Sequence, residues 1–262
     1  MLRKKWILIL VLLAVVPCLA QQNNPQRTHY YDTFARGTLD PNKWLATIPQ
    51  AWGSPLEVVR EVKFGQLRLG IRNTGKTDSD SGAEWAETEL YFVNPNHVSS
   101  ITTDLAVIKA DAIQCPGNQA TDFGDTSIGG TFFNAGTGDP AQDVTAIVVS
   151  VSTFWDGPKL WTALWWSTGD GSAGDLQYIG EYPLGQRLRA SIKWDQVNHR
   201  FIGSITINGV ATEVFSTYAV PDGMPATQPQ KALNVSVTSQ NCTATRTVSH
   251  VEAFFDNVII NQ

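Results

Sequence analysis

The sequence predicts an all-β protein, a two-sheet antiparallel β-sandwich of the jelly-roll kind. Apolar and polar residues alternate with period two in several segments, such as 67–72 and 187–194. This alternation is typical of strands with one face in a core. Glycine and proline recur throughout and mark turns. After residue 20, no segment carries the apolar stripe of an amphipathic helix. Together these three observations favour a sandwich of short strands.

Individual segments support this class. The segment 143–154 is apolar at both odd and even positions, which predicts a central strand covered on both sides. The run Leu188, Ala190, Ile192 and Trp194 alternates with polar residues, which predicts a half-buried strand. Asn208-Gly209 fits a two-residue type I′ hairpin, because that turn needs positive φ at both central residues.

The N-terminal residues 1–20 read as a signal peptide. Arg3, Lys4 and Lys5 precede an apolar run that is shorter than the ~20 residues of a membrane helix. Cys18 raises the alternative of a lipid anchor, but Pro17 directly before it argues against one. We expect a flexible segment at 21–29, one sandwich domain at 30–262, no membrane span, and a secreted, extracellular or periplasmic location.

The remaining chain is acidic. Removal of the three basic residues in 1–20 leaves 16 Lys and Arg against 24 Asp and Glu, a net charge of −8. A field of this sign repels nucleic acid and anionic membranes. Cys115 and Cys242 form an even pair, which predicts one disulfide in an exported chain, with two free buried thiols as the alternative. The four histidines show no metal-ligand spacing.

Three segments carry a family resemblance. Tyr31-Asp32-Thr33-Phe34 with 39–44, the paired segment 188–209, and Ala253–Val258 at the end resemble the secreted concanavalin A-like lectin/glucanase domains. The resemblance implies that the first and last strands lie side by side and bring Phe34 and Phe255 into one core. It also implies a role as a sugar-binding lectin, a glycoside hydrolase or a polysaccharide lyase. Because one fold serves all three, the site must be argued separately.

The best candidate site is Trp85-Ala86-Glu87-Thr88-Glu89-Leu90-Tyr91. On a strand, Trp85, Glu87, Glu89 and Tyr91 share one face. Aromatic rings pack on sugars and carboxylates accept hydroxyl hydrogen bonds. Glu87 and Glu89 could also be the acid and nucleophile of a retaining glycosidase. The alternative is a solvated face with two carboxylates.

The segment departs from the enzyme patterns that it resembles. Tyr91 stands where family 16 glycosidases carry the last of three alternating acids. Thr88-Glu89-Leu90 matches the centre of the alginate-lyase motif, but Glu87 and Tyr91 replace both of its arginines.

Two further features are candidates. Trp161 and Trp165 share one face of a predicted strand and could form a second sugar platform, while Trp166 faces the other way. The alternative is that these tryptophans are all buried. The Asp- and Gly-rich segment 167–175 could hold calcium, although a hairpin loop is the better interpretation. The resemblance places a structural calcium near Asp256, and no cofactor is required.

The leading hypothesis is therefore a secreted protein that binds a polysaccharide or oligosaccharide. The alternatives are a glycoside hydrolase using Glu87 and Glu89, a polysaccharide lyase, and a structural or adhesive domain without a sugar site. The oligomeric state is not determined by the sequence.

Overall fold

The structure is a computed structural model that describes residues 29–46, 50–51, 56–116, 123–153 and 159–261. The predicted signal peptide at 1–20 and residues 21–28 of the predicted flexible segment lie outside the described residues. Within the described ranges, no helix has the length and apolar character needed to cross a membrane. Almost every regular element is a strand, and the only helices described are three single 3₁₀ turns.

The larger sheet contains nine of the described strands, and all its pairs are antiparallel. Its order is β1-β5-β15-β7-β8-β9-β10, with β2 paired to β5 and β14 paired to β7. Its strands are β1 (Trp44–Ala46), β2 (Gln50–Ala51), β5 (Ala83–Phe92), β7 (Phe123–Asn134), β8 (Asp143–Thr153), β9 (Lys159–Thr168), β10 (Gly174–Pro183), β14 (Met224–Pro225) and β15 (Lys231–Gln240).

The smaller sheet contains seven described strands in the order β13-β12-β11-β6-β16-β4-β3, again antiparallel. Its strands are β3 (Glu57–Lys63), β4 (Gln66–Thr74), β6 (Ser100–Ile113), β11 (Leu188–Asp195), β12 (Arg200–Ile207), β13 (Val210–Thr217) and β16 (Val248–Ile260). The 3₁₀ turns are η1 (Pro95–His97), η2 (Pro140–Gln142) and η3 (Gln196–Asn198). The all-β, two-sheet antiparallel sandwich expected from the sequence is confirmed.

The core lies between the two sheets, because every second side chain of each strand points inward. On β5, for example, Ala86 and Leu90 are fully buried. The core is rich in aromatic side chains, which contribute large buried areas. The largest of these fully buried rings are Phe34, Phe92, Phe133, Phe201 and Phe255.

The segment 31–34 lies beside the last strand, β16, as the resemblance implied. An isolated bridge pairs Asp32 with Val258, and the amide of Tyr31 donates to the Val258 carbonyl at 2.7 Å. Phe34 and Phe255 both belong to the main core cluster. At the opposite end of the smaller sheet, Asn208 and Gly209 have φ of 52° and 81°, which confirms the predicted hairpin turn between β12 and β13.

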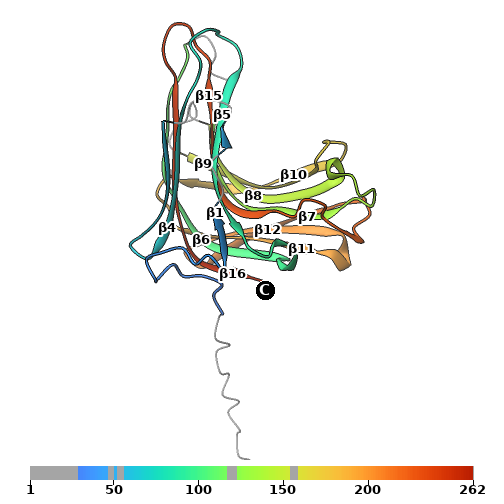
Figure 1. Ribbon diagram of the computed structural model, residues 1–262. Coiled ribbons are helices and arrows are strands. Elements are labelled where there is room, and N and C mark those ends of the chain that lie inside the picture. Colours follow the sequence, from blue (N-terminus) through green and yellow to red (C-terminus); the bar gives the residue numbers. More distant parts are fainter. Residues whose placement is uncertain (1–28, 47–49, 52–55, 117–122, 154–158, 262) are drawn as a thin grey trace, which may run out of the picture.

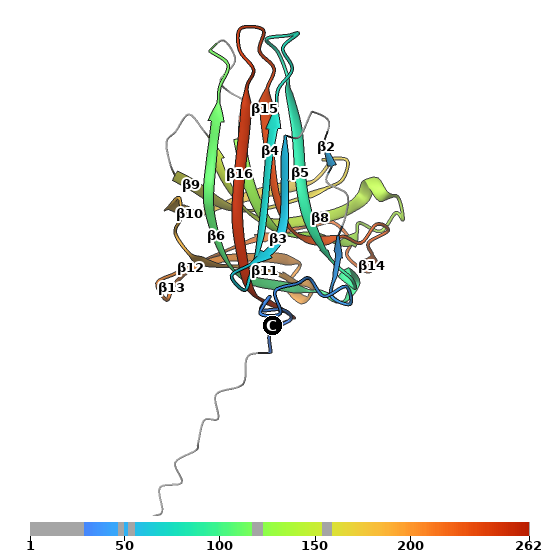
Figure 2. The same cartoon turned by 60° about the vertical axis from the view of Figure 1, so that its left-hand side comes forward.

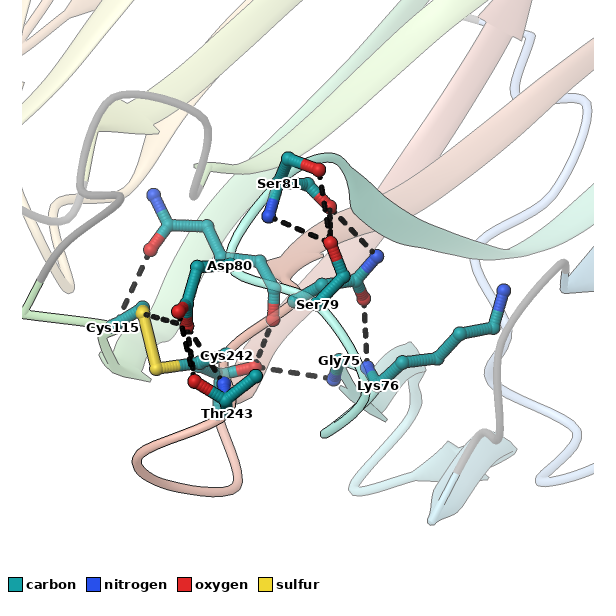
Figure 3. Close-up of a disulfide and its surroundings, with 11 residues drawn as sticks. Gly75, Lys76, Ser79, Asp80, Ser81, Cys115, Cys242 and Thr243 are labelled. Carbon is teal, nitrogen blue, oxygen red and sulfur yellow. Dashed lines mark hydrogen bonds between the residues drawn. A yellow bond between two sulfur atoms is a disulfide. The ribbon is translucent and has the colours of Figure 1, made fainter.

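The predicted disulfide between Cys115 and Cys242 is present. Figures 1 and 2 show β4, β5, β6, β15 and β16 extending together away from the C-terminus, and the disulfide lies beyond the far ends of β6 and β15. Asp80, from the loop before β5, stands beside it (Figure 3) and accepts hydrogen bonds from the amide and hydroxyl of Thr243 at 2.8 and 2.9 Å. The disulfide therefore links the end of β6 in the smaller sheet to the end of β15 in the larger sheet.

The larger sheet is bent. In Figure 1, β5 and β15 stand upright while β8 and β10 run across the molecule above β11 and β12. The outer face of the larger sheet, which points away from the smaller sheet, is therefore the concave side of this bend. We call it the concave face, and it carries the candidate site.

Candidate functional site

Strand β5 presents the predicted quartet on the concave face. Its side chains alternate between half-buried and fully buried from Ala83 to Phe92. Trp85, Glu87, Glu89 and Tyr91 are the half-buried members, and Thr88 between them is fully buried in the core. The shared face that the sequence predicts is therefore the solvent-facing side of the sheet, because the alternate side chains of β5 pack in the core.

Strand pairing extends this face across β15 and β7. In antiparallel sheets, residues directly opposite one another have their side chains on the same face. Three such rows cross the three strands. Two rows consist of polar residues, and the third has small residues at two of its three positions. The rows are Glu87–Ser236–Asp125, Glu89–Asn234–Ser127 and Tyr91–Ala232–Gly129.

A groove of about 220 Å³ lies over the second and third rows. Its walls include Glu89, Tyr91 and Asn234, and Gly129 and Ile147 belong to its lining. The groove is deep beside Tyr91 because Ala232 and Gly129 have almost no side chain. Gly129 also has φ of +137°, a conformation that side chains disfavour. We call this space the central groove.

Asn234 joins the two candidate carboxylates of β5, Glu87 and Glu89. Its Nδ2 donates to Glu87 Oε2 and to Glu89 Oε1, each at 3.0 Å. These two oxygens are therefore at most about 6 Å apart, twice the 3.0 Å bond. The other oxygen of Glu89 accepts a hydrogen bond from the Tyr91 hydroxyl. The arrangement holds both carboxylates in fixed positions beside the central groove.

The acids on this face differ from ordinary surface carboxylates. Burial, helped by the neighbouring charges of Glu89 and Asp125, raises the pKa of Glu87 to about 7. Burial also raises the pKa of Asp125 to about 6, although the Ser236 hydroxyl donates to it at 2.6 Å. Burial and the hydrogen bond to Glu89 raise the pKa of the Tyr91 hydroxyl. The raised pKa therefore favours the protonated form of Glu87 up to a higher pH than for an ordinary surface glutamate.

The predicted tryptophan platform lies farther along the same face. Trp161 and Trp165 are half-buried on the concave side of β9, opposite Val151 and Ile147 of β8. Trp166 faces the core and donates from its indole N–H to Ser216 at 2.8 Å. Neither Trp161 nor Trp165 lines the central groove itself, since the lining ends at Thr145 and Ile147 of β8 and β9 is the next strand. Trp155, close to them in sequence, lies outside the described residues.

Sequence reasoning missed several side chains of this face. Tyr178 and Leu176 on β10 are 55% and 49% exposed and pair with Ala163 and Trp165, so they extend the platform. Asn234 and Asp125 were also missed, because only strand pairing brings β15 and β7 beside β5. The alternation of Leu176 and Tyr178 with polar residues is a sequence signal that could have identified these two residues as one face of a strand. No local signal in the sequence points to Asn234 or Asp125.

Asp256 lies on β16 in the smaller sheet, away from the concave face. Its carboxylate accepts a hydrogen bond from Arg187 at 3.0 Å and from the amide of Asn257 at 2.8 Å. A guanidinium is thus the positive partner beside it, and a structural calcium at Asp256 stays a prediction. The segment 167–175 joins β9 to β10, where Asp170 accepts from the Ser172 amide at 2.9 Å, as in a hairpin loop.

No known family model matches the chain, and no curated protein matches it in sequence. Solved structures show a distant similarity. A glycoside hydrolase family protein from Mycobacterium thermorestibile is 12% identical, with 85% of this chain and 98% of that chain covered and a TM-score of 0.44. A legume lectin-like domain from Entamoeba histolytica is 10% identical over 82% and 90%, with a TM-score of 0.36.

A family 7 alginate lyase is 13% identical over 79% of this chain and 84% of that chain, with a TM-score of 0.40. These neighbours belong to the classes that the concanavalin A-like resemblance implied. At identities and TM-scores this low, however, they carry no argument about what this chain binds.

Proposed function

We propose that this protein binds carbohydrate, with a polysaccharide chain lying across the concave face from β5 to β10. The observation that carries the proposal is the composition of that one face. Hydrogen-bonding groups, namely Glu87, Glu89 and Asn234, stand at one end, and flat rings, Trp165 and Tyr178, stand at the other.

The spacing suits a polymer better than a single sugar. Strands β5 and β9 are separated by β15, β7 and β8, and neighbouring strands lie about 4.8 Å apart, so the two ends are about 19 Å apart along the sheet. Several linked sugar rings span such a length. Pyranose C–H faces stack on aromatic rings, and their hydroxyls hydrogen-bond to carboxylates and amides. The disulfide fits an extracellular or periplasmic protein, where such polymers occur.

Affinity electrophoresis and calorimetry on a panel of soluble polysaccharides test the proposal. We expect Trp165→Ala and Tyr178→Ala each to weaken binding about tenfold, which is a loss of about 1.4 kcal/mol. Phe215→Ala is the matched control, because this ring is 57% exposed on the smaller sheet. The proposal fails if no polysaccharide binds, or if the control weakens binding as much as the platform variants do.

A retaining glycoside hydrolase is the second candidate. It is favoured by the shared Asn234 donor, which keeps the two carboxylate oxygens within about 6 Å, near the ≈ 5–5.5 Å typical of retaining enzymes. In this mechanism Glu87, whose pKa is raised to about 7, is the acid, and Glu89 is the nucleophile. Release of reducing ends, lost in both Glu87→Gln and Glu89→Gln while binding persists, distinguishes hydrolysis from binding alone.

A polysaccharide lyase and a purely structural domain have less support. A lyase acts on uronates, and the carboxylates of such a substrate would face Glu87, Glu89 and Asp125. The described residues that line the central groove include no Lys or Arg to offset that repulsion. A structural domain leaves the half-buried acids and the exposed Tyr178 without a role, and it predicts no polysaccharide binding in any of these assays.

A further inference from the structure

We infer that the glycan of the concave face carries free amino groups, so that its ammonium groups lie against the carboxylates around the central groove. This inference rests on the proposed carbohydrate binding and narrows it to one class of ligand, a chain of amino sugars. Three independent observations point to a cationic chain: the placement of the acids, the lack of Lys and Arg in the described lining of the central groove, and the hydrogen-bonding capacity that the carboxylates leave unused.

The first observation is the placement of the acids. Glu87 and Glu89 stand on β5, and Asp125 stands two strands away on β7 in the same row as Glu87. All three face the concave side beside the central groove. Their mutual repulsion is visible in Glu87, because the charges of Glu89 and Asp125 add to burial in raising its pKa.

The second observation is the position of the lysine and arginine side chains near the central groove. The described lining of the central groove contains no Lys or Arg. Lys231 precedes the groove residue Ala232, but its side chain turns into the protein, donates to the Pro95 and Thr131 carbonyls at 2.9 and 2.8 Å, and lies over the Phe132 ring. Arg60 donates to Thr88 on the core side of β5, and its charge acts on Glu89 and Tyr91. It is not among the groups that shift the pKa of Glu87 or Asp125, which therefore face the concave side without an offsetting cation among the described residues.

The third observation concerns hydrogen-bonding capacity. The Nδ2 of Asn234 donates hydrogen bonds to both glutamates, while its Oδ1 is buried with no hydrogen-bond partner among the described residues. Ionised carboxylates accept several hydrogen bonds and donate none. The unused capacity at Glu89, and at Glu87 in its ionised form, is therefore acceptor capacity. An ammonium group offers three donors and no acceptor, whereas an N-acetylated or hydroxyl-bearing sugar brings further acceptors.

A metal ion fits this face less well. A metal site needs ligand atoms that converge on one point. Among the described residues, the single group of three acidic, His or Cys ligand atoms close enough to share an ion is Asp80 with the disulfide sulfurs of Cys115 and Cys242. Glu87, Glu89 and Asp125 thus do not converge on one cation. Acids that are spread over the concave face can each pair with a different positive charge of a chain that carries such charges at regular intervals.

Three β-linked hexasaccharides that differ only in one substituent provide the test: those of glucosamine, N-acetylglucosamine and glucose. At low salt and slightly acidic pH, where the amine is charged, we expect the glucosamine hexamer to bind at least about tenfold tighter than the other two. Added salt should shrink this preference, because it screens exposed charges. Calorimetry in two buffers should also show proton release from Glu87, since an ammonium favours its ionised form.

Variants localise the effect. Asp125→Asn should remove most of the preference for glucosamine while leaving binding of the glucose hexamer unchanged. Glu89→Gln should weaken binding of the glucosamine hexamer more than that of the glucose hexamer, and Glu87→Gln should abolish the proton release. Phe215→Ala, on the other sheet, should change neither. Equal binding of the three hexamers would overturn amine recognition but leave carbohydrate binding in place. If none of the hexamers or polysaccharides binds, the proposed function itself fails.

Discussion

Glu87 and Glu89 accept hydrogen bonds from one and the same nitrogen, Nδ2 of Asn234, each at 3.0 Å. Two carboxylates that stand two residues apart on a strand repel each other, and a shared donor between them reduces that cost. This relationship links β5 to β15 and determines how the acidic end of the concave face titrates. It leads to the first prediction.

Replacement of Asn234 with Ala should raise the pKa of Glu87 further above about 7, because the hydrogen bond from Asn234 favours its ionised form. A hydrogen bond to a charged group contributes about 1.5–3 kcal/mol, and we expect a rise of about one pH unit, which corresponds to 1.36 kcal/mol. Carboxyl NMR titration measures it. Thr238→Ala, on the same face of β15 beside Trp85, is the control. An unchanged pKa in Asn234→Ala would contradict the shared-donor interpretation.

The pKa of Glu87 also makes stability depend on pH. The pKa rises from 4.5 in the unfolded chain to about 7 in the folded protein, so the folded state binds more protons between these values. Stability should therefore fall as pH rises from 4.5 to 7. Because Glu87 is partly exposed, we expect a loss of only about 1–2 kcal/mol. Denaturant unfolding of Glu87→Gln should lack this loss, and a parallel pH profile in both proteins would refute it.

Lys231 should act in the opposite sense at higher pH. Burial lowers its pKa from 10.5 to about 7, so the unfolded state binds more protons between pH 7 and 10.5. Stability from this residue should therefore rise with pH across that window. In Lys231→Met the rise should disappear, although the Pro95 and Thr131 carbonyls lose their donor and overall stability falls. The slope against pH, rather than the absolute stability, decides this prediction.

Gly129 should resist substitution. A Cβ at this position would lie 2.2 Å from the Ala146 carbonyl oxygen, and the φ of +137° strains any other residue. We expect Gly129→Ala to destabilise the fold by about 2–3 kcal/mol, because the added Cβ would clash with the backbone of β8. Gly223→Ala is the matched control, because no atom lies within 4 Å of its added Cβ. Thermal unfolding should show the cost in Gly129→Ala alone, and equal melting temperatures would contradict it.

The disulfide should contribute substantially to stability. Cys115 and Cys242 are 127 residues apart in sequence, and closing so long a loop restricts the unfolded chain by about 4–5 kcal/mol in the loop-entropy model. Reduction, or the double variant Cys115→Ser with Cys242→Ser, should lower stability toward that extent. The double variant should not respond to reductant. Equal unfolding midpoints with and without reductant in the native protein would overturn this expectation.

Much of the fold could be predicted from local pattern. Period-two alternation identified the strand of Leu188 to Trp194, and Asn208-Gly209 identified the hairpin turn between β12 and β13, because side-chain direction and turn geometry are properties of a few adjacent residues. The same reasoning assigned Glu87 and Glu89 to one face and separated Trp161 and Trp165 from Trp166. These inferences needed only the parity of positions along one strand.

The composition of the site could not be predicted in the same way. Asn234 and Asp125 are far from Glu87 and Glu89 in the sequence, so no local pattern connects them. Only the strand order β5-β15-β7 places their side chains in shared rows. The position of the tryptophans one strand beyond the central groove, with Tyr178 next to them, is likewise a consequence of sheet order.

The sequence by itself indicated strands, turns, the cysteine pair and which candidate side chains of one strand share a face, since these depend on neighbouring residues. The tertiary structure alone decided which strands lie side by side, and thereby that two glutamates share one amide donor. It also decided that burial brings the pKa of Glu87 to about 7, because desolvation and charge repulsion depend on groups that only the folded chain brings together.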